Sequence, residues 1–219
     1  MTTEEYMSNY WNQYILIEKE FRETIQYVAL CEENKNVFSD AYLKILLQIG
    51  SEIDIVFKQY CTSLDSSFNG DKIGHYKNCI QNNKEEFIFQ AIKIYVNGDI
   101  VKPWTGWQIM QAPFWWTAYN KIKHNRYSIC EIDAIQKQGY KFANQEYTLE
   151  ALAGLFQILI YYYYDLVLVE GKKVMTPVPG SRLFRLTGEN WDIVDFYTDY
   201  AFYINDEGYL ICEFGSLPY

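Results

Sequence analysis

Residues Leu149–Val169 read LEALAGLFQILIYYYYDLVLV, and this stretch decides the fold. It is apolar almost throughout and lacks the polar face that a surface helix has. Thr148 can cap its start. Glu150, Gln157, Asp165 and four tyrosine hydroxyls interrupt it, and a membrane-spanning helix would have to satisfy those groups inside lipid. We therefore expect a buried central helix rather than a transmembrane one, and no membrane partner.

The composition of the whole chain excludes several classes of protein. Hydrophobic residues make up 49% of the 219 residues, with 21 Tyr, 13 Phe and 6 Trp, which excludes a disordered chain. The five cysteines are odd in number, widely spaced and without a preceding signal segment, so we expect reduced thiols in a cytoplasmic protein. Two histidines without clustered Cys or carboxylates, and scattered glycines, predict no metal and no cofactor.

Four further helices can cover the central one. A helix over about 3–29 has one apolar stripe, and Ser39 or Asp40 can cap a second that runs to about Tyr60. A shorter helix is expected around 74–81. Pro113 then starts another helix, because proline fits the first turn. The second stripe consists of Tyr42, Ile45, Leu46, Ile49, Ile53, Val56, Phe57 and Tyr60.

Strands are expected in two places. Residues 87–96 and 100–104 flank Asn97-Gly98, which favours a type I′ hairpin turn. After a break at Thr176–Gly180, residues 181–186, 200–204 and 209–214 indicate short strands. The predicted fold class is mainly α: an up-down helical bundle over 1–172 with a β-hairpin insertion near 87–104, followed by a small β-rich C-terminal appendage over 176–219.

Functional side chains concentrate in Phe114–Arg126, FWWTAYNKIKHNR. Successive residues of a helix are 100° apart, so this helix has one face toward the core and an opposite face. We expect the core face to hold Trp115, Ala118, Tyr119 and Ile122, and the opposite side to hold Trp116, Asn120, Lys123, His124 and Tyr127.

The charge around this helix opposes that of the chain. Residues 101–145 hold six cations and two acids, a local +4, while the chain carries −9, which leaves −13 for the remainder. A basic patch on an acidic protein suits an anion, such as a phosphate backbone, at one defined place. Candidate anion- or RNA-binding residues are Lys121, Lys123, Arg126 and Trp116. The alternative is a solvated helix face whose lysines bind nothing.

Arg126 falls on the core side of the helix. A guanidinium there needs an aromatic ring or a carboxylate, and Glu52, at the edge of the second helix's stripe, is the first candidate for a structural ion pair. The alternative is that the helix ends near Arg126 and leaves its side chain to solvent.

Two segments resemble the HEPN family of helical-bundle proteins of prokaryotic defence and toxin–antitoxin systems. They are Ser51–Lys58 and Tyr119–Arg126. The resemblance implies a homodimer and, in active members, a metal-independent RNase with an arginine four to six residues ahead of a histidine. Here Asn120, not arginine, stands four residues ahead of His124.

Two functions therefore stay open. In the first, the chain is a dimerising module that binds RNA, a nucleotide phosphate or a protein partner. In the second, the resemblance implies a metal-independent endoribonuclease in which His124 is the acid or base, Lys123 or Lys121 stabilises the phosphorane and Asn120 orients the phosphate or the histidine. A module that only dimerises or binds a protein predicts carboxylate partners for His124 and Arg126, whereas a site that cleaves RNA or binds a nucleotide predicts an exposed His124 and Lys123.

Overall fold

The structure, a computed structural model, describes residues 1–109, 111–172, 176–188, 200–204 and 210–214. It is mainly helical, with small antiparallel strand pairs. The helical elements are α1 (Thr3–Tyr6), η1 (Met7–Trp11), α2 (Asn12–Thr24), η2 (Glu32–Asn34), α3 (Asp40–Leu64), α4 (Ile73–Asn83), η3 (Glu85–Phe89), η4 (Thr105–Ile109), α5 (Phe114–Asn125), η5 (Gly139–Phe142) and α6 (Gln145–Val169). The strands are β1 (Ala91–Ile94), β2 (Ile100–Val101), β3 (Ile129–Ile132), β4 (Ile135–Gln138), β5 (Phe184–Thr187), β6 (Tyr200–Ile204) and β7 (Leu210–Phe214).

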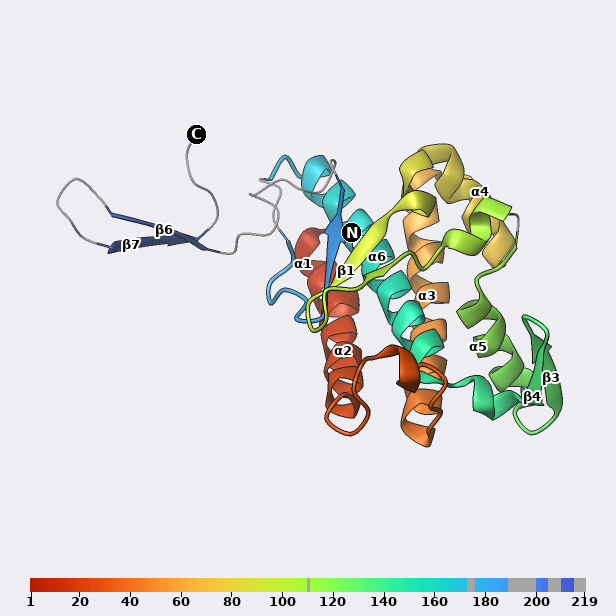
Figure 1. Ribbon diagram of the computed structural model, residues 1–219. Helices are drawn as coiled ribbons and strands as arrows, with labels where there is room; N and C mark the ends of the chain where they lie inside the picture. Colours follow the sequence, from red (N-terminus) through yellow and green to blue (C-terminus); the bar gives the residue numbers. More distant parts are fainter. Residues whose placement is uncertain (110, 173–175, 189–199, 205–209, 215–219) are drawn as a thin grey trace.

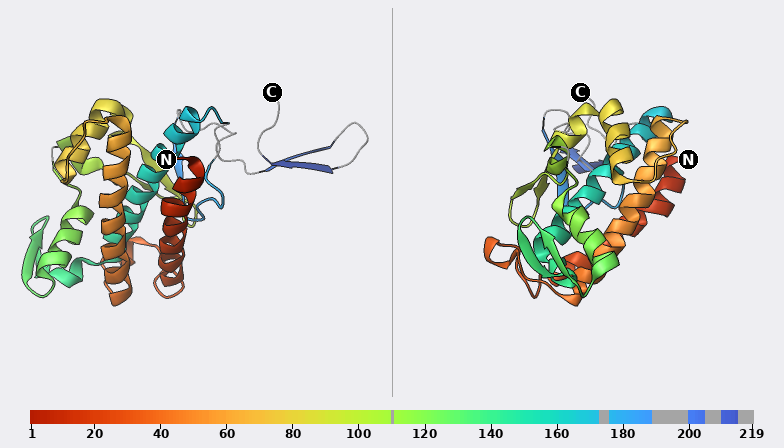
Figure 2. Two further views of the ribbon diagram at one scale, coloured as in Figure 1. Left: turned by 180° about the vertical axis from the view of Figure 1, so that it is seen from behind. Right: turned by 90° about the vertical axis from the view of Figure 1, so that its right-hand side faces the viewer.

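The apolar helix α6 is the central element. It runs between α2 and α3, and α5 packs against both α3 and α6 (Figures 1 and 2). Every residue from Ala151 to Tyr162 is buried. Gln157, the polar residue within that stretch, donates its Nε2 to the carbonyl of Phe87 at 2.6 Å. By length and composition alone α6 is the one helix among the described residues that could cross a membrane, and 72% of its apolar window is buried inside the protein.

The helix α3 forms as its sequence predicts. Ser39 caps it by accepting a hydrogen bond from the Tyr42 amide at 3.1 Å, and its whole predicted stripe is buried. Gly50 lies on the side of α3 that meets α5, where the ring of Tyr119 lies directly over it. The N-terminal helix is shorter than expected and ends at Thr24, whose hydroxyl bonds back to the Phe21 carbonyl at 2.6 Å.

The tyrosine run of α6 is used inside the protein. The Tyr162 ring stacks on Tyr60 of α3 at 5.0 Å and meets Tyr6 of α1 edge-on at 5.6 Å. The Tyr6 hydroxyl in turn donates to the Leu159 carbonyl at 2.7 Å. Aromatic bodies thus fill the space between three helices, while the buried hydroxyl finds a backbone acceptor.

A three-stranded sheet with the order β2-β1-β5 differs from the sequence prediction in three ways. Residues 87–89 belong to η3 rather than to a strand. Strand β1 pairs with β2, but the loop between Ile94 and Asp99 is longer than the two-residue turn expected of Asn97-Gly98. Strand β5, which we assigned to the C-terminal appendage, pairs with β1 through Ala91↔Thr187.

A buried carboxylate ties the segment before β5 to α2. Glu18 is 2% exposed and accepts hydrogen bonds from the Tyr14 hydroxyl at 2.7 Å, the Arg182 amide at 2.8 Å and the Ser181 hydroxyl. These donors compensate the charge that burial would otherwise make costly. Farther on, β6 pairs antiparallel with β7, and the rest of the predicted appendage (189–199, 205–209 and 215–219) lies outside the described residues.

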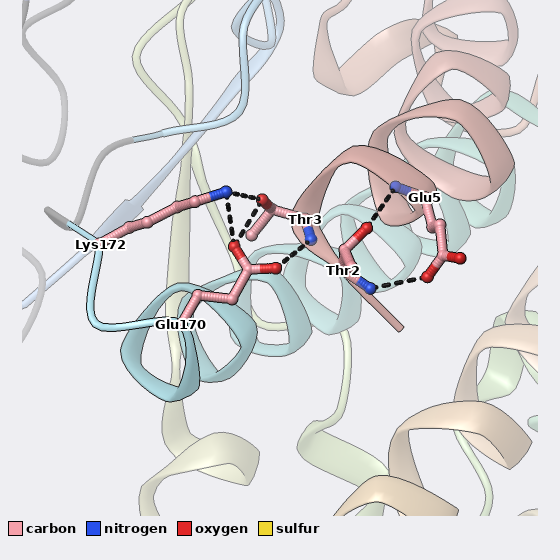
Figure 3. Close-up of polar contacts among 5 residues, drawn as sticks. All are labelled: Thr2, Thr3, Glu5, Glu170 and Lys172. Atoms are coloured by element: carbon pink, nitrogen blue, oxygen red, sulfur yellow. Dashed lines mark hydrogen bonds and ion pairs between the residues drawn. The ribbon is translucent and has the colours of Figure 1, made fainter.

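A polar cluster joins the end of α6 to the start of α1 (Figure 3). Glu170 accepts hydrogen bonds from the amide and the hydroxyl of Thr3, both at 2.8 Å. Lys172 lies 2.7 Å from the same carboxylate and 2.8 Å from the Thr3 hydroxyl. The bond from Lys172 and those from Thr3 lower the pKa of Glu170 to about 2.

We expect Gly50→Ala to destabilise the protein by about 1–3 kcal/mol. A Cβ at this position would lie 2.3 Å from Cδ2 of Tyr119, whose ring is buried and has little room to move. Gly74→Ala in α4 is the matched control, because a Cβ there meets nothing within 4 Å and should stabilise the helix by about 0.5–1 kcal/mol. Urea unfolding of both variants measures the difference, and equal stabilities would contradict the close contact.

The Glu170 cluster predicts a definite pH dependence. A carboxyl with a folded pKa of about 2 stabilises the folded state fully above its ordinary pKa of 4.5, and the contribution is lost as the pH falls toward 2. Glu170→Gln should therefore lower the melting temperature at neutral pH, with a difference that vanishes toward pH 2. Thermal unfolding across this range tests it, with exposed Glu85→Gln as the control. A difference that stays constant with pH would contradict the prediction.

Candidate anion-binding site

The core face of α5 is buried as the sequence predicts. Trp115, Ala118, Tyr119 and Ile122 are each at most 5% exposed. The Trp115 indole donates to the Pro103 carbonyl at 2.8 Å, which fixes the helix to the segment before it. This anchoring determines which side chains of α5 reach solvent.

Two predicted site residues, Trp116 and Asn120, make contacts within α5 instead. Trp116 is only 7% exposed, because its ring packs against Trp115 at 5.9 Å and Tyr119 at 5.2 Å between centroids. The prediction that Trp116 contacts a bound anion or base is therefore wrong. The amide of Asn120 donates to the Trp116 carbonyl at 3.0 Å, one turn back in its own helix, and so does not orient His124.

The last turn of α5 is open to solvent. Lys123 and His124 are both exposed, and Lys121 is half-buried. The Lys123 ammonium lies 5.5 Å from the centroid of the Tyr119 ring and 3.4 Å from its hydroxyl. Among the described residues, the His124 imidazole has no hydrogen-bond or ion-pair partner, so the carboxylate partner expected of a purely structural histidine is not found there.

The ion pair predicted between Arg126 and Glu52 is not formed within the described part of the chain. Arg126 caps the C-terminus of α5, so the alternative, a helix that ends at this point, is correct. Glu52 follows Gly50 by two residues, or about 200° around α3. Because Gly50 contacts α5 and Glu52 acts on Tyr10 of η1, the carboxylate lies on the wrong side of α3.

A strand pair folds back beside the end of α5 (Figure 1). Strands β3 and β4 pair through Cys130↔Lys137, and the chain then returns to α5, where the Tyr140 amide donates to the Arg126 carbonyl at 2.8 Å. Gly139 makes this approach possible, because a Cβ there would lie 2.5 Å from the Asn125 carbonyl oxygen.

Aromatic rings and lysines alternate along this region. The Tyr140 ring lies 6.2 Å from that of Tyr127 and 5.8 Å from that of Phe38. The Lys141 ammonium is 5.8 Å from the Tyr140 centroid and 6.0 Å from that of Phe38. Tyr127 is 75% exposed and Phe38 44%. We call the following residues the basic–aromatic surface: Phe38, Lys121, Lys123, His124, Arg126, Tyr127, Lys137, Tyr140 and Lys141.

The cations of this surface lack carboxylate partners. Across the described residues, ion pairs engage lysines of other regions, such as Lys44 with Glu20 and Lys84 with Asp165, but none of the five Lys and Arg between 121 and 141. Burial, and then repulsion from Lys141, lowers the pKa of Lys137. The negative charge of an anion bound between these two ammonium groups would favour their protonated forms and so oppose this shift.

Part of this surface could not be found from the sequence. Lys137 and Lys141 contribute to the positive charge of residues 101–145, but no helix or strand is expected between Ser128 and Glu146, so their place beside α5 is not predicted. The β3–β4 turn uses Asp133 and Ala134 at φ of 50° and 60°, and this pair is a weak turn signal. Phe38 reaches the surface only through tertiary packing.

Comparison of the chain with family models, with curated proteins and with solved structures finds no match. The function of the basic–aromatic surface must therefore be inferred from its chemical groups. Unpaired ammonium and guanidinium groups attract phosphate or carboxylate oxygens, and exposed rings can stack on planar groups such as nucleobases.

Gly139→Ala tests how this surface is assembled. A methyl group cannot lie 2.5 Å from a backbone oxygen, so the chain between β4 and α5 must shift, at an expected cost of about 1–3 kcal/mol. We also expect faster hydrogen exchange at the Tyr140 amide, which bonds to Arg126. Stability and exchange equal to those of the unchanged protein would show that the close approach is unimportant.

Proposed function

We propose that this chain is a HEPN-like binding module of a prokaryotic defence or stress system. In this proposal it is cytoplasmic, its helices form an up-and-down bundle with the β1–β2 hairpin inserted, and two copies form a homodimer. The module holds RNA or a nucleotide phosphate on its basic–aromatic surface, and a protein partner is the alternative occupant.

The unpaired cations carry this proposal. Residues 121–141 hold five Lys and Arg against two acids in a chain of net charge −9, yet no described carboxylate pairs with any of the five. One of the two acids, Glu131, is instead bonded to the Gln136 amide at 2.6 Å. The positive charges of these side chains repel one another, and no described carboxylate relieves that repulsion. An anionic ligand would therefore be attracted to this surface.

Binding fits these residues better than cleavage does. No arginine stands four to six residues ahead of His124, and the Asn120 side chain is bonded to its own helix. An acid or base in catalysis is usually oriented by a neighbouring group, and His124 has none among the described residues. The imidazole is therefore assigned to contact with the phosphate rather than to chemistry.

A metal-independent endoribonuclease is the second candidate. The observation that favours it is the exposure of His124 and Lys123 in one turn of α5, where an imidazole and an ammonium group can reach the same phosphate. Cleavage would then have to proceed without the arginine.

Binding of a fluorescent single-stranded oligoribonucleotide tests the first candidate. We expect Lys137→Gln combined with Lys141→Gln to weaken binding severalfold at low salt. The salt slope should fall by about 1.4, since each lost phosphate contact on a single strand reduces it by about 0.7. The control is Lys19→Gln on α2, an exposed lysine outside the surface. Unchanged affinity in the double variant would refute the assignment of the surface.

Incubation with structured and unstructured RNA in EDTA separates the two candidates. Under the binding proposal neither the unchanged protein nor His124→Ala cleaves RNA. The proposed homodimer is tested separately by sedimentation of the protein alone. Cyclic-phosphate ends produced by the unchanged protein and not by His124→Ala would establish the endoribonuclease instead.

A further inference from the structure

A second feature lies at the other side of the segment that contains Phe38. It is a hollow of about 440 Å³, open to solvent, between η2, the β1–β2 loop and the first turns of α6. Its volume falls in the range of small-molecule sites. None of its lining residues belongs to the basic–aromatic surface, so this feature is independent of the function proposed above.

The charges in the hollow do not balance. Four acids (Glu32, Asp99, Glu146 and Glu150) and two lysines (Lys35 and Lys102) line it. Lys35 is already shared by Glu32 and by Glu146, at 3.7 Å from the latter. Asp99 accepts a hydrogen bond from the Asn97 amide at 2.7 Å. The hollow therefore lacks positive charge.

Glu150 is the acid of the hollow that is left without a partner. It lies half-buried in the second turn of α6, and no hydrogen bond or ion pair from a described residue reaches its carboxylate. Burial, and then repulsion from Glu146, raise the pKa of Glu150 to about 7, although Lys35 opposes this shift. The charged or titratable groups around Glu150 are Cys31, Glu32, Lys35, Asp99, Lys102, Glu146 and Tyr147.

The remaining walls of the hollow combine aliphatic side chains with the polar side chains of Asn97, Thr105 and Gln145. Leu30, Ile94, Ile100, Val101 and Leu149 contribute branched apolar side chains. A hydrated inorganic ion would leave these walls unused. In the described residues, moreover, no three His, Cys, Asp or Glu side chains converge as a metal site requires.

We propose that this hollow binds a small organic amine, whose ammonium group pairs with Glu150 and whose apolar part packs on the aliphatic wall. An ammonium group supplies the missing charge and a donor for the unpartnered carboxylate. An anion would meet three further acids, and a neutral apolar molecule would leave Glu150 buried without a partner.

The amine also changes the protonation of the site. An alkylammonium ion stays charged throughout the neutral range, whereas Glu150 is only half ionised near pH 7. The amine binds the carboxylate form, so affinity should rise about tenfold from pH 6 to pH 8 as that form is populated. Binding at pH 7 should release protons to the buffer.

Calorimetric titration of the full chain with n-pentylamine at pH 8 tests the proposal. We expect saturable binding in the millimolar range or tighter, at least about tenfold weaker in Glu150→Gln, the equivalent of about 1.4 kcal/mol. Glu85→Gln, an exposed acid outside the hollow, should bind as the unchanged protein does. Melting curves confirm that both variants fold; Gln at position 150 removes a buried charge and should not impair folding.

Two further ligands make the result specific. n-Pentanol has the same apolar part without the charge and should bind at least about tenfold more weakly. Nα-acetyl-lysine methylamide presents the same ammonium group on a peptide, and tighter binding of this ligand would identify the source of the amine as a protein side chain. Equal binding of the alcohol, full binding by Glu150→Gln, or no saturable binding of any amine would each overturn the proposal.

Discussion

Because α6 is apolar around most of its circumference, some other element must cover each of its sides. The N-terminal helices cover one side and α3 another. The helix α5 contacts α6 directly, and Phe184 of β5 meets Phe156 at 5.7 Å. Each fully buried Leu, Ile or Phe contributes about 1.5–3 kcal/mol, so these contacts dominate the stability of the fold. The positions of α5 and of the sheet follow from this need to cover α6.

The same constraint explains which polar groups the interior tolerates. The Gln157 amide and the Tyr6 hydroxyl are both buried in the α6 environment, and each donates to a backbone carbonyl. Asn144 caps the start of α6 by accepting from the Tyr147 amide at 2.9 Å. A buried polar group without such partners costs about 1–3 kcal/mol. The donors of these buried groups thus find backbone acceptors, whereas Oε1 of Gln157 and the half-buried carboxylate of Glu150 have no partner among the described residues.

Local patterns could predict the helices, and long-range pairing could not be predicted. The stripe of α3 and its Ser39 cap depend on residues close together in the sequence, and both are confirmed. Strand β5 pairs with β1 across nearly a hundred residues, and Glu18 fixes the approach of the chain from α2. No spacing in the sequence contains that information, which is why β5 was assigned to a separate appendage.

The candidate site shows the same division. Helical periodicity predicted the exposure of Lys123 and His124, because their side follows from the buried positions of α5. Periodicity also placed Trp116 on that side, where neighbouring rings cover it. A helical wheel gives the direction of a side chain but not what lies in that direction. The predicted ion pair between Arg126 and Glu52 was wrong for a related reason. Gly50 is the residue of α3 that contacts α5, and Glu52 lies on another side of that helix.

One short segment joins the two regions to which we assign ligands. Residues 35–38 run beside the start of α6, where the Gln145 amide donates to the Val37 carbonyl at 3.0 Å and the Glu146 amide to that of Lys35 at 3.1 Å. Phe38 of this segment faces the basic–aromatic surface, and Lys35 faces the acidic hollow. These backbone hydrogen bonds hold residues 35–38 against the start of α6. The positive charges of the basic–aromatic surface and the acids of the hollow therefore stay on opposite sides of this segment. That separation leaves an excess of positive charge on the basic–aromatic surface and an excess of negative charge in the hollow.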